Sequence, residues 1–261
     1  MPAYGYFPQK NKLKDFLLRI IGLPHPGGRL RTNIFLSMFV NKGLTLDAGC
    51  GEGAVCRELS KRGYKMVGID INREGLEYAK DAAKKINTKP VFICGNIEKI
   101  PFPENKFDQV VSLDVLEHVN NHMKAIKEIR RVLKKGGTFI ASMPTPYYLT
   151  KSLLGINFEN ELKAIGHLRA GYIYKDFKKI LEQNGFKVVA HKEYYGFFSR
   201  LSNELVYLIL GAKRISKARK KMYGFSFLSI ITFIMIYSFM KLDFLLPFCK
   251  QGLVMVKAIK K

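Results

Sequence analysis

The sequence predicts an α/β fold built on a doubly wound, mostly parallel sheet. Short apolar runs typical of buried strands alternate along the chain with segments whose apolar residues recur at helical spacing. Most of the helical segments end at a glycine, which is a common helix stop. Strands separated by helices form a parallel sheet covered on both faces, and 261 residues suffice for one such domain.

In the first half of the chain, strand and helix signals alternate regularly. The first helical segment, AVCRELSKRG, ends at Gly63, and the second is capped by Asn72, whose side chain can accept from a free backbone N–H. Each of these helices lies between two apolar runs. Strands are expected at 43–50, 64–70 and 90–96, and helices at 54–63 and 72–86.

The second half continues the alternation with longer elements. FDQVVSLDV is an apolar run followed by a helical pattern that stops at a glycine pair, and GTFIASM follows directly. A further amphipathic segment ends at Gly185 and leads into KVVAHKEYY. Strands are expected at 107–115, 137–143 and 187–195, and helices at 122–136 and 174–186.

Composition limits the classes of function. The net charge of +23 predicts either a polyanionic neighbour, which is nucleic acid or an anionic membrane surface, or simply a lysine-rich surface. The four cysteines lack CxxC or finger spacing, so neither a zinc finger nor a disulfide framework is expected, which suits a reducing compartment. Charged residues interrupt the apolar part of residues 1–20, so a secretory signal is not expected there.

Three glycines, Gly49, Gly51 and Gly53, occupy alternate positions directly after the first strand, in LDAGCGEG. In open α/β sheets ligands bind beyond the carboxyl ends of the strands, and a glycine turn lets a ligand lie against backbone N–H groups. The second strand ends in Asp70, at a distance where a carboxylate can accept both hydroxyls of a ribose. The G-x-G-x-G spacing departs from the dinucleotide fingerprint, but the combination predicts a cofactor site.

Four segments together resemble the class I S-adenosylmethionine-dependent methyltransferases, in the broad group that includes quinone-biosynthesis enzymes. They occur in the family's order and spacing and cover roughly residues 43 to 200. The resemblance implies a Rossmann-like seven-stranded sheet whose last strand is GLVMVKAIK, and this chain's own sequence predicts a hydrophobic helical insertion before that strand. The matching segments are LDAGCGEG (46–53), VGIDIN (67–72), GNIEKIPFPENKFDQVVSLDVLEHV (95–119) and RVLKKGGTFIASMPTP (131–146).

The resemblance, together with the composition of the two ends of the core, divides the chain into four expected parts. An N-terminal basic helical extension precedes the S-adenosylmethionine-binding core, and a basic and apolar helical insertion separates that core from the final strand, which returns to the sheet. The insertion would act as a lid or as a membrane-surface element. The boundaries are 1–42, 43–200, 201–250 and 251–261.

The resemblance also implies how S-adenosylmethionine is bound. The three glycines would let its methionine portion pack on the backbone, with Asp47 orienting the ammonium group, Asp70 holding the ribose and Ile71 against the adenine. Family members often have Gly-Asp after the third strand; Asn96 stands here, and its amide oxygen can still accept from the adenine amino group. The predicted cofactor residues are Asp47, Gly49, Gly51, Gly53, Asp70, Ile71, Asn96, Ile97 and Leu113.

Few residues are candidates for acid–base chemistry. Positioning of the acceptor supplies much of the rate, and a base is needed only for an unactivated hydroxyl, amine or carbon. His118 is the predicted catalytic base, although Glu117 and His118 could instead merely begin the next helix. His167 and Arg169 fall on a loop that often lines the acceptor pocket in the family; the alternative for both is capping and packing.

The same segment also has a spacing that could form a metal site. Asp114, Glu117 and His118 have i, i+3, i+4 spacing, and some ubiquinone O-methyltransferases resemble this with a Glu-x-x-Glu-His run. The first position here is aspartate, and no further ligands corroborate the set. The predicted site therefore contains no metal.

The C-terminal part has an unusual charge pattern. No acidic residue lies between Glu204 and Asp243; six of the nine residues 213–221 are basic, and the seventeen residues 224–240 carry no charge. Seventeen residues are the lower limit for a membrane span, but a span would separate 252–260 from the sheet. We expect an insertion lying in the interface of an anionic membrane, and the alternative is a lid of two buried helices.

These observations predict a methyltransferase that acts on a lipid-like or lipid-linked small molecule, in a cytoplasmic protein peripherally associated with a membrane. An RNA methyltransferase is the first alternative, although the basic run is followed by aliphatic residues and not interleaved with stacking aromatics. A non-catalytic membrane adaptor with a relict fold is the second, against which the intact glycine turn and Asp70 argue. No motif specifies the atom methylated or the oligomeric state.

Overall fold

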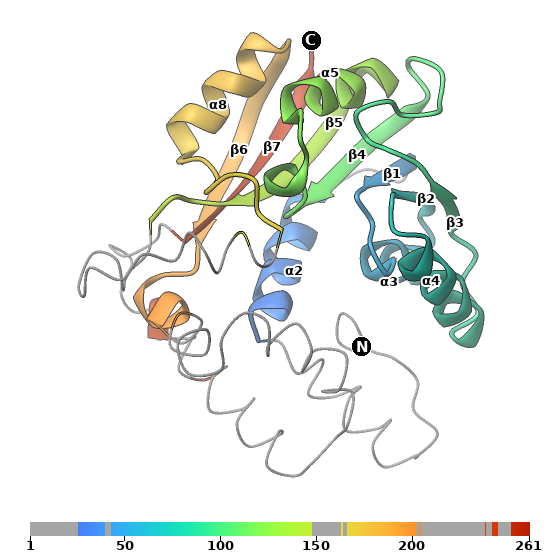
Figure 1. Cartoon of the computed structure of the whole chain (residues 1–261), viewed down its shortest axis with the longest axis horizontal. Coiled ribbons are helices and arrows are strands. Elements are labelled where there is room, and N and C mark those ends of the chain that lie inside the picture. Colours follow the sequence, from blue (N-terminus) through green and yellow to red (C-terminus); the bar gives the residue numbers. More distant parts are fainter. Residues whose placement is uncertain are drawn as a thin grey trace.

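The computed structural model describes residues 26–39, 43–147, 163, 166–201, 204, 238, 242–244 and 252–261. Strands and helices alternate along most of this part of the chain (Figure 1). In order, the elements are α2 (Pro26–Met38), β1 (Leu44–Ala48), α3 (Ala54–Lys61), β2 (Lys65–Asp70), α4 (Arg73–Lys85), β3 (Val91–Cys94), β4 (Phe107–Leu113), the 3₁₀ helix η1 (Leu116–His118), α5 (His122–Val132), β5 (Leu133–Pro144), α8 (Tyr174–Gln183), β6 (Phe186–Tyr194), the 3₁₀ helix η2 (Leu242–Phe244) and β7 (Leu253–Lys260).

The strands form one seven-stranded sheet in the order β3-β2-β1-β4-β5-β7-β6. The first five strands along the chain pair in parallel, whereas β7 lies antiparallel between β5 and β6. β7 inserts along its whole length, since its pairing with β5 runs from Ile259 opposite Thr138 to Leu253 opposite Pro144. The predicted fold class, including the seventh strand, is confirmed.

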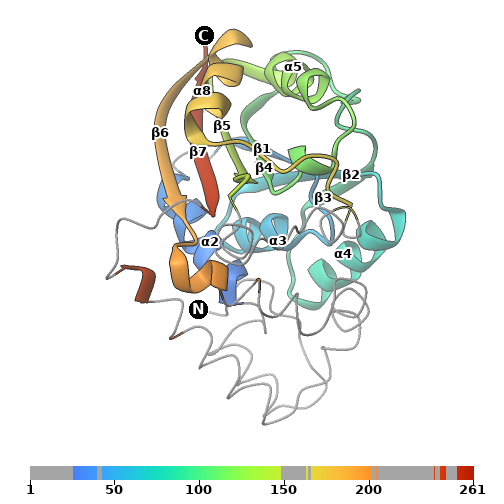
Figure 2. The same cartoon turned by 60° about the vertical axis from the view of Figure 1, so that its left-hand side comes forward.

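Alternate residues of the central strands point to opposite faces of the sheet, and each face is covered by helices (Figures 1 and 2). Val110 of β4 packs on the face covered by α5 and α8, and its neighbour Val111 packs on the face covered by α2 and α3. Phe139 and Ile140 of β5 divide in the same way. Burial on both faces explains the continuous apolar runs that predicted these strands.

The boundary between α5 and β5 differs from the prediction. Helix α5 begins after the Asn121 cap and ends at Val132, and β5 begins at the next residue, not at 137. Leu133 is fully buried and pairs with Phe107 of β4 before the register shifts. The tertiary pairing of Leu133 therefore ends the helix earlier than the glycine pair that marked its end in the sequence.

The predicted extension and insertion are described only in part. Helix α2 lies within the N-terminal region, and the basic run 213–221 lies outside the described residues. The end of the insertion contacts the core, because the Asp243 carboxylate accepts hydrogen bonds from the backbone N–H groups of Phe198 and Ser199 at 2.8 and 3.0 Å. In the described ranges, no helix combines the length and apolar character that crossing a membrane requires.

Candidate functional site

The glycine turn connects β1 to α3 at the carboxyl end of the sheet. All three glycines have left-handed backbone angles, with φ of 85° at Gly49, 50° at Gly51 and 70° at Gly53. The turn is held against β2, since the N–H groups of Gly49 and Cys50 both donate to the carbonyl of Ile69, at 2.8 and 3.0 Å. Glycine adopts these angles without the steric cost that a side chain would add.

The three glycines are not equivalent in their surroundings. A Cβ on Gly49 would lie 2.4 Å from Val115, and one on Gly53 would lie 2.5 Å from Phe92, so packing within the protein excludes a side chain at both. A Cβ on Gly51 would meet no described atom within 4 Å. The sequence attributed all three glycines to a ligand. Among the three, only Gly51 borders space that is free of described atoms, which is where a ligand could lie.

Asp70, at the end of β2, is part of the same turn. Its Oδ2 accepts a hydrogen bond from the N–H of Gly51, and its Oδ1 accepts one from the N–H of Asn72, both at 2.8 Å. Each carboxylate oxygen keeps a second lone pair that can accept from a hydroxyl. Asp70 therefore orders the glycine turn and has acceptor capacity left, a dual role that its sequence distance from Gly49 did not reveal.

Asp47 lies beneath the turn and is only 2% exposed. Its Oδ2 is 3.5 Å from the Cys56 thiol, which donates to it. Burial raises the pKa of Asp47 to about 7, the Asp70 carboxylate adds to the rise, and the Cys56 hydrogen bond opposes it. A cation placed beside Asp47 would favour the charged form, which agrees with its predicted role toward an ammonium group.

The raised pKa predicts how Asp47 affects stability. Between pH 4 and 7 the folded state holds the Asp47 proton more tightly than the unfolded state, so the contribution of Asp47 to stability falls as the pH rises. Asp47→Asn mimics the protonated form, and at pH 8 it should be more stable than the unsubstituted protein by up to about 4 kcal/mol. Urea unfolding at pH 5 and pH 8 measures this; equal differences at both pH values would contradict it.

The remaining predicted cofactor residues differ in accessibility. Ile71 is 73% exposed beside Asp70, as a surface for an adenine ring would be. Asn96 is exposed, but its Oδ1 already accepts from the N–H of Glu98 at 2.8 Å, so one oxygen lone pair and the amide hydrogens remain. Ile97 is buried in the main core, and Leu113 is partly buried against the second cluster. The position of Ile97 gives it a packing role.

Helix α2 contributes a residue that the sequence did not single out. Arg31 forms an ion pair with Asp114, which follows β4 directly. Asp114 has a φ of 54°, its N–H donates to the carbonyl of Ser142, and its carboxylate accepts from the Ser142 hydroxyl. These contacts hold α2 against the carboxyl ends of β4 and β5. An ion pair between residues so far apart in sequence leaves no local signal.

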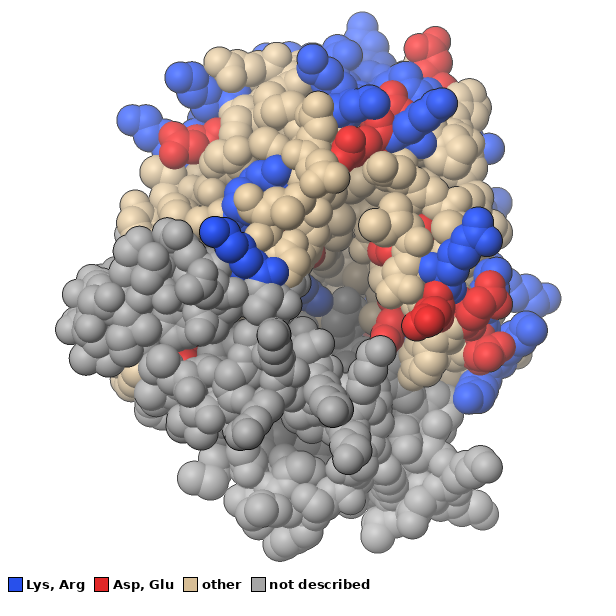
Figure 3. Space-filling model, in the orientation of Figure 1, with Lys and Arg blue, Asp and Glu red and all other residues tan. Residues whose placement is uncertain are grey.

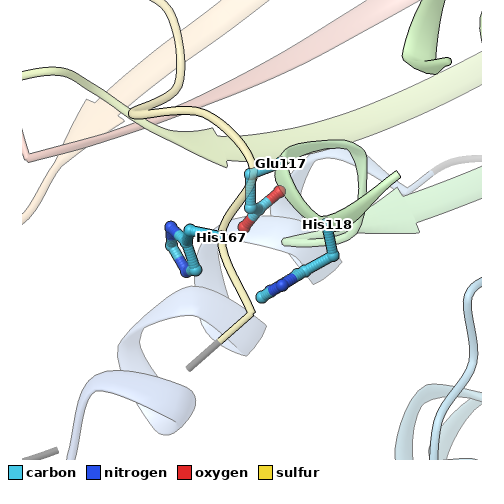
Figure 4. Close-up of side chains that lie close together, drawn as sticks. All are labelled: Glu117, His118 and His167. Carbon is cyan, nitrogen blue, oxygen red and sulfur yellow. The ribbon is translucent and has the colours of Figure 1, made fainter. Parts of the chain in front are cut away.

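The structure brings Glu117 and His118 of η1 together with His167 of the loop before α8 (Figure 4). Each side chain offers one ligand atom, and these three atoms lie within 4.8 Å of one another. The two imidazole rings meet edge to face, with centroids 4.6 Å apart. Glu117 and His118 lie in a separate 3₁₀ turn, and α5 begins only at His122.

The loop that carries His167 is clamped to η1 by backbone contacts. The N–H of Leu168 donates to the carbonyl of Glu117 at 2.9 Å, and Arg169 donates to the carbonyls of Leu116 and Asn120. For Arg169 the structure therefore favours the capping role among the two alternatives. The same clamp holds the neighbouring His167 against the turn that carries Glu117 and His118.

Two atoms of the cluster are buried without a hydrogen-bond partner among the described residues, Oε2 of Glu117 and Nδ1 of His167. Each such atom costs about 1–3 kcal/mol. Burial, together with the Asp114 carboxylate, raises the pKa of Glu117 well above its usual range. Burial and the His118 ring lower the pKa of His167 to about 4. His167 is therefore neutral at physiological pH, with an imidazole lone pair available.

The three residues that helical spacing suggested as metal ligands, Asp114, Glu117 and His118, do not all come together in the structure. The Asp114 carboxylate is bound to Arg31 and Ser142, and the following turn is a 3₁₀ helix, so Asp114, Glu117 and His118 do not share one α-helical turn. The third member of the cluster is His167. The sequence had marked His167 as a pocket residue, but nothing local connects it to a residue 50 positions earlier.

The Methyltransferase domain family matches residues 46–141, which include the glycine turn, Asp70 and η1. The uncharacterized protein MJ0638 of Methanocaldococcus jannaschii is 35% identical over 165 residues, covering 62% of this chain and 64% of that protein. A ubiquinone biosynthesis O-methyltransferase of Pelagibacter ubique is 32% identical over 136 residues, covering 52% of this chain and 50% of the relative. The chain thus spans less than two thirds of either relative.

Among solved structures, the 4+2 cyclase SpnF resembles this chain with a TM-score of 0.61 and 18% identity, over 99% of this chain and 88% of that one. At this level of identity the similarity establishes the fold alone. That protein is named for a cyclisation, so the same fold is not restricted to one reaction. The assignment of chemistry therefore depends on the residues of the site.

Proposed function

Since the chain belongs to the class I S-adenosylmethionine-dependent methyltransferases, we propose that it transfers a methyl group from S-adenosylmethionine to a lipid-like or lipid-linked small molecule at a membrane surface. The family implies the methyl donor. The acceptor class and the membrane are inferred from this chain's own sequence, and each has a separate test below.

The observation that carries the methyl-transfer proposal is the space, free of described atoms, at Gly51 beside the Asp70 carboxylate. A ligand with a ribose could approach the turn at Gly51 and donate hydroxyl hydrogen bonds to Asp70, while Ile71 offers an apolar surface next to it. Asp47 lies beneath the turn, where an ammonium group would favour its charged form. These residue types match the chemical parts of S-adenosylmethionine, so they fit this cofactor.

When bound, S-adenosylmethionine supplies an electrophilic methyl group on a sulfonium. The residues of this chain then bind and orient the cofactor and hold an acceptor in line with the methyl group, which accounts for much of the rate in such transfers. His118 stands at the carboxyl end of β4, where such an acceptor would be expected. Its Nδ1 carries the proton donated to the Gly166 carbonyl at 2.9 Å, so Nε2 presents a lone pair.

The acceptor class is inferred from the charge pattern of the insertion. Its basic run 213–221 and the uncharged block 224–240 are adjacent, so lysine and arginine can bind lipid headgroups while apolar side chains enter the boundary region. In the view of Figure 3, the basic side chains of the described residues are interspersed with acidic ones. That distribution does not favour a continuous nucleic-acid groove on this face. One relative is also named for ubiquinone biosynthesis.

Transfer of labelled methyl groups tests the acceptor class directly. Purified protein with labelled S-adenosylmethionine is incubated in parallel with a total lipid extract and with total RNA. We expect label in the lipid fraction. Label in RNA alone would replace the lipid proposal with the nucleic-acid alternative, and cofactor binding without any transfer would favour an adaptor.

Removing charge from the basic run should weaken membrane binding. Each basic residue near an anionic surface contributes about 1 kcal/mol, so even if half is lost to geometry, replacing Lys217, Arg219, Lys220 and Lys221 with glutamine should reduce vesicle binding about 30-fold. Binding should also become less sensitive to salt. Co-sedimentation with vesicles of mixed neutral and anionic lipids measures both effects.

A matched control changes the same number of charges on the core. Lys84, Lys85, Lys175 and Lys179 are exposed residues of α4 and α8, and their replacement with glutamine should leave vesicle binding within about twofold. Equal losses in both variants would show that net charge alone drives binding and would contradict a tether located in the insertion.

A further inference from the structure

The methyl-transfer proposal uses only His118 of the cluster formed by Glu117, His118 and His167, and leaves the grouping of the three side chains without a role. Its three ligand atoms come from two segments far apart in sequence and lie within 4.8 Å of one another. Metal–ligand bonds of about 2.1 Å at tetrahedral angles place the ligand atoms about 3.4 Å apart, so small side-chain rotations suffice. Figure 4 shows the Glu117 carboxylate directed toward the space between the two imidazole rings.

Glu117 is the least accessible member, at 1% exposed, and its Oε2 has no hydrogen-bond partner among the described residues. The nearby cations are engaged elsewhere: Arg31 pairs with Asp114, and Arg169 donates to two backbone carbonyls. A buried carboxylate is normally paired or bound to a metal. The unpartnered oxygen therefore points to a positively charged ligand between the side chains.

The orientation of His118 is also that of a metal ligand. Its Nδ1 donates to the Gly166 carbonyl at 2.9 Å, which fixes the proton on Nδ1 and leaves the Nε2 lone pair for an ion. Metal-bound histidines commonly donate their other ring nitrogen to a carbonyl in this way. His167 adds a second imidazole, and its Nδ1 is buried without a partner among the described residues.

We propose that Glu117, His118 and His167 bind a divalent transition-metal ion. Two imidazole nitrogens and one carboxylate suit Zn²⁺, Mn²⁺, Fe²⁺ or Co²⁺, whereas Mg²⁺ and Ca²⁺ favour sites made of oxygen atoms alone. Three protein ligands leave at least one coordination position open for water or for an oxygen of another molecule. In this assignment the His118 Nε2 binds the ion, so His118 is a ligand and not a free base.

Direct metal binding tests the site without depending on methyl transfer. The protein is stripped with a chelator, dialysed and titrated with Co²⁺, whose visible absorption reports nitrogen and oxygen ligands, and Zn²⁺ is then added in competition. The titration is made in a Cys94→Ser background, since Cys94 is an exposed free thiol that could bind either ion. We expect one ion per chain and bleaching of the cobalt spectrum by zinc.

Variants identify the ligands. Glu117→Gln and His167→Ala should each weaken Co²⁺ binding at least 100-fold, because each removes one of three protein ligands. His191→Ala is the matched control; His191 lies on β6, stacked on Tyr174 and outside the cluster, and its removal should leave the affinity within about twofold. Thermal unfolding of the metal-free proteins shows whether each variant is folded.

The outcomes separate this proposal from the proposed function. Absence of a cobalt spectrum in the folded unsubstituted protein, or unchanged affinity in the two ligand variants, would overturn the metal site and leave cofactor binding unaffected. Conversely, stoichiometric metal binding without binding of S-adenosylmethionine would uphold the metal site and overturn the proposed function.

Discussion

Replacing Gly51 with leucine is expected to abolish binding of S-adenosylmethionine, lowering the affinity at least 100-fold. Gly51 alone among the three glycines of the turn borders space free of described atoms, so the new side chain would occupy the volume proposed for the cofactor. Its φ of 50° adds strain of about 1–2 kcal/mol, which the protein should tolerate as a whole. Isothermal titration calorimetry measures the loss of affinity.

Gly63→Leu is the control for that strain. Gly63 also has a left-handed φ, 84°, and a Cβ there would meet no described atom within 4 Å, but it follows α3 at the far end of the helix from the turn. The Gly63→Leu protein should lose a similar amount of stability and keep its affinity for the cofactor. Equal affinity in both leucine variants would place the cofactor away from Gly51.

Asp70→Ala is expected to weaken S-adenosylmethionine binding by about 1.5–3 kcal/mol, which is roughly 10- to 150-fold. The substitution removes the carboxylate proposed to accept the ribose hydroxyls and also the two hydrogen bonds that it accepts from Gly51 and Asn72. Asp70→Asn keeps an oxygen that can accept from one of them and should lose less affinity. Calorimetry gives the affinities, and unfolding in urea reports the contribution of the turn to stability.

Asp108→Ala provides the matched control. Asp108 also accepts a hydrogen bond from a backbone N–H, that of Leu44 at 2.8 Å, but at the opposite end of β1, where it also binds Lys134. It should reduce stability without reducing affinity for the cofactor. If both alanine variants lost affinity in proportion to stability, Asp70 would be a structural residue only.

Much of the architecture could be predicted from local signals. The sheet is buried on both faces, so its strands are continuous apolar runs, and the amphipathic helices between them end near glycines or begin at Asn72. The seventh strand could be predicted only through the family resemblance, because the pairing of β7 with β5 and β6 joins distant segments. The end of α5 at Val132 could not be predicted from the sequence, because the pairing of Leu133 with Phe107 decides where the helix ends.

For the proposed cofactor site, the order of strands and motifs in the sequence was sufficient to locate the glycine turn and the Asp70 carboxylate. Both follow strands, and parallel strands bring their carboxyl ends to one edge. The role of each glycine in the turn depends on the side chains that surround it. Val115 and Phe92 leave no room for a side chain at Gly49 and Gly53, whereas Gly51 faces space free of described atoms. These clearances are properties of the packed chain and are not encoded by the spacing of the glycines.

The cluster near η1 shows an even larger difference between what the sequence predicted and what the tertiary contacts determine. The sequence supplied Glu117, His118 and His167 as residues of interest and grouped the first two with Asp114 by helical spacing. Only the tertiary structure decided that Asp114 binds Arg31 and that His167 takes the third place. The physical reason is that ligand sets and ion pairs depend on distances of a few ångströms between segments whose separation in the chain carries no periodic signal.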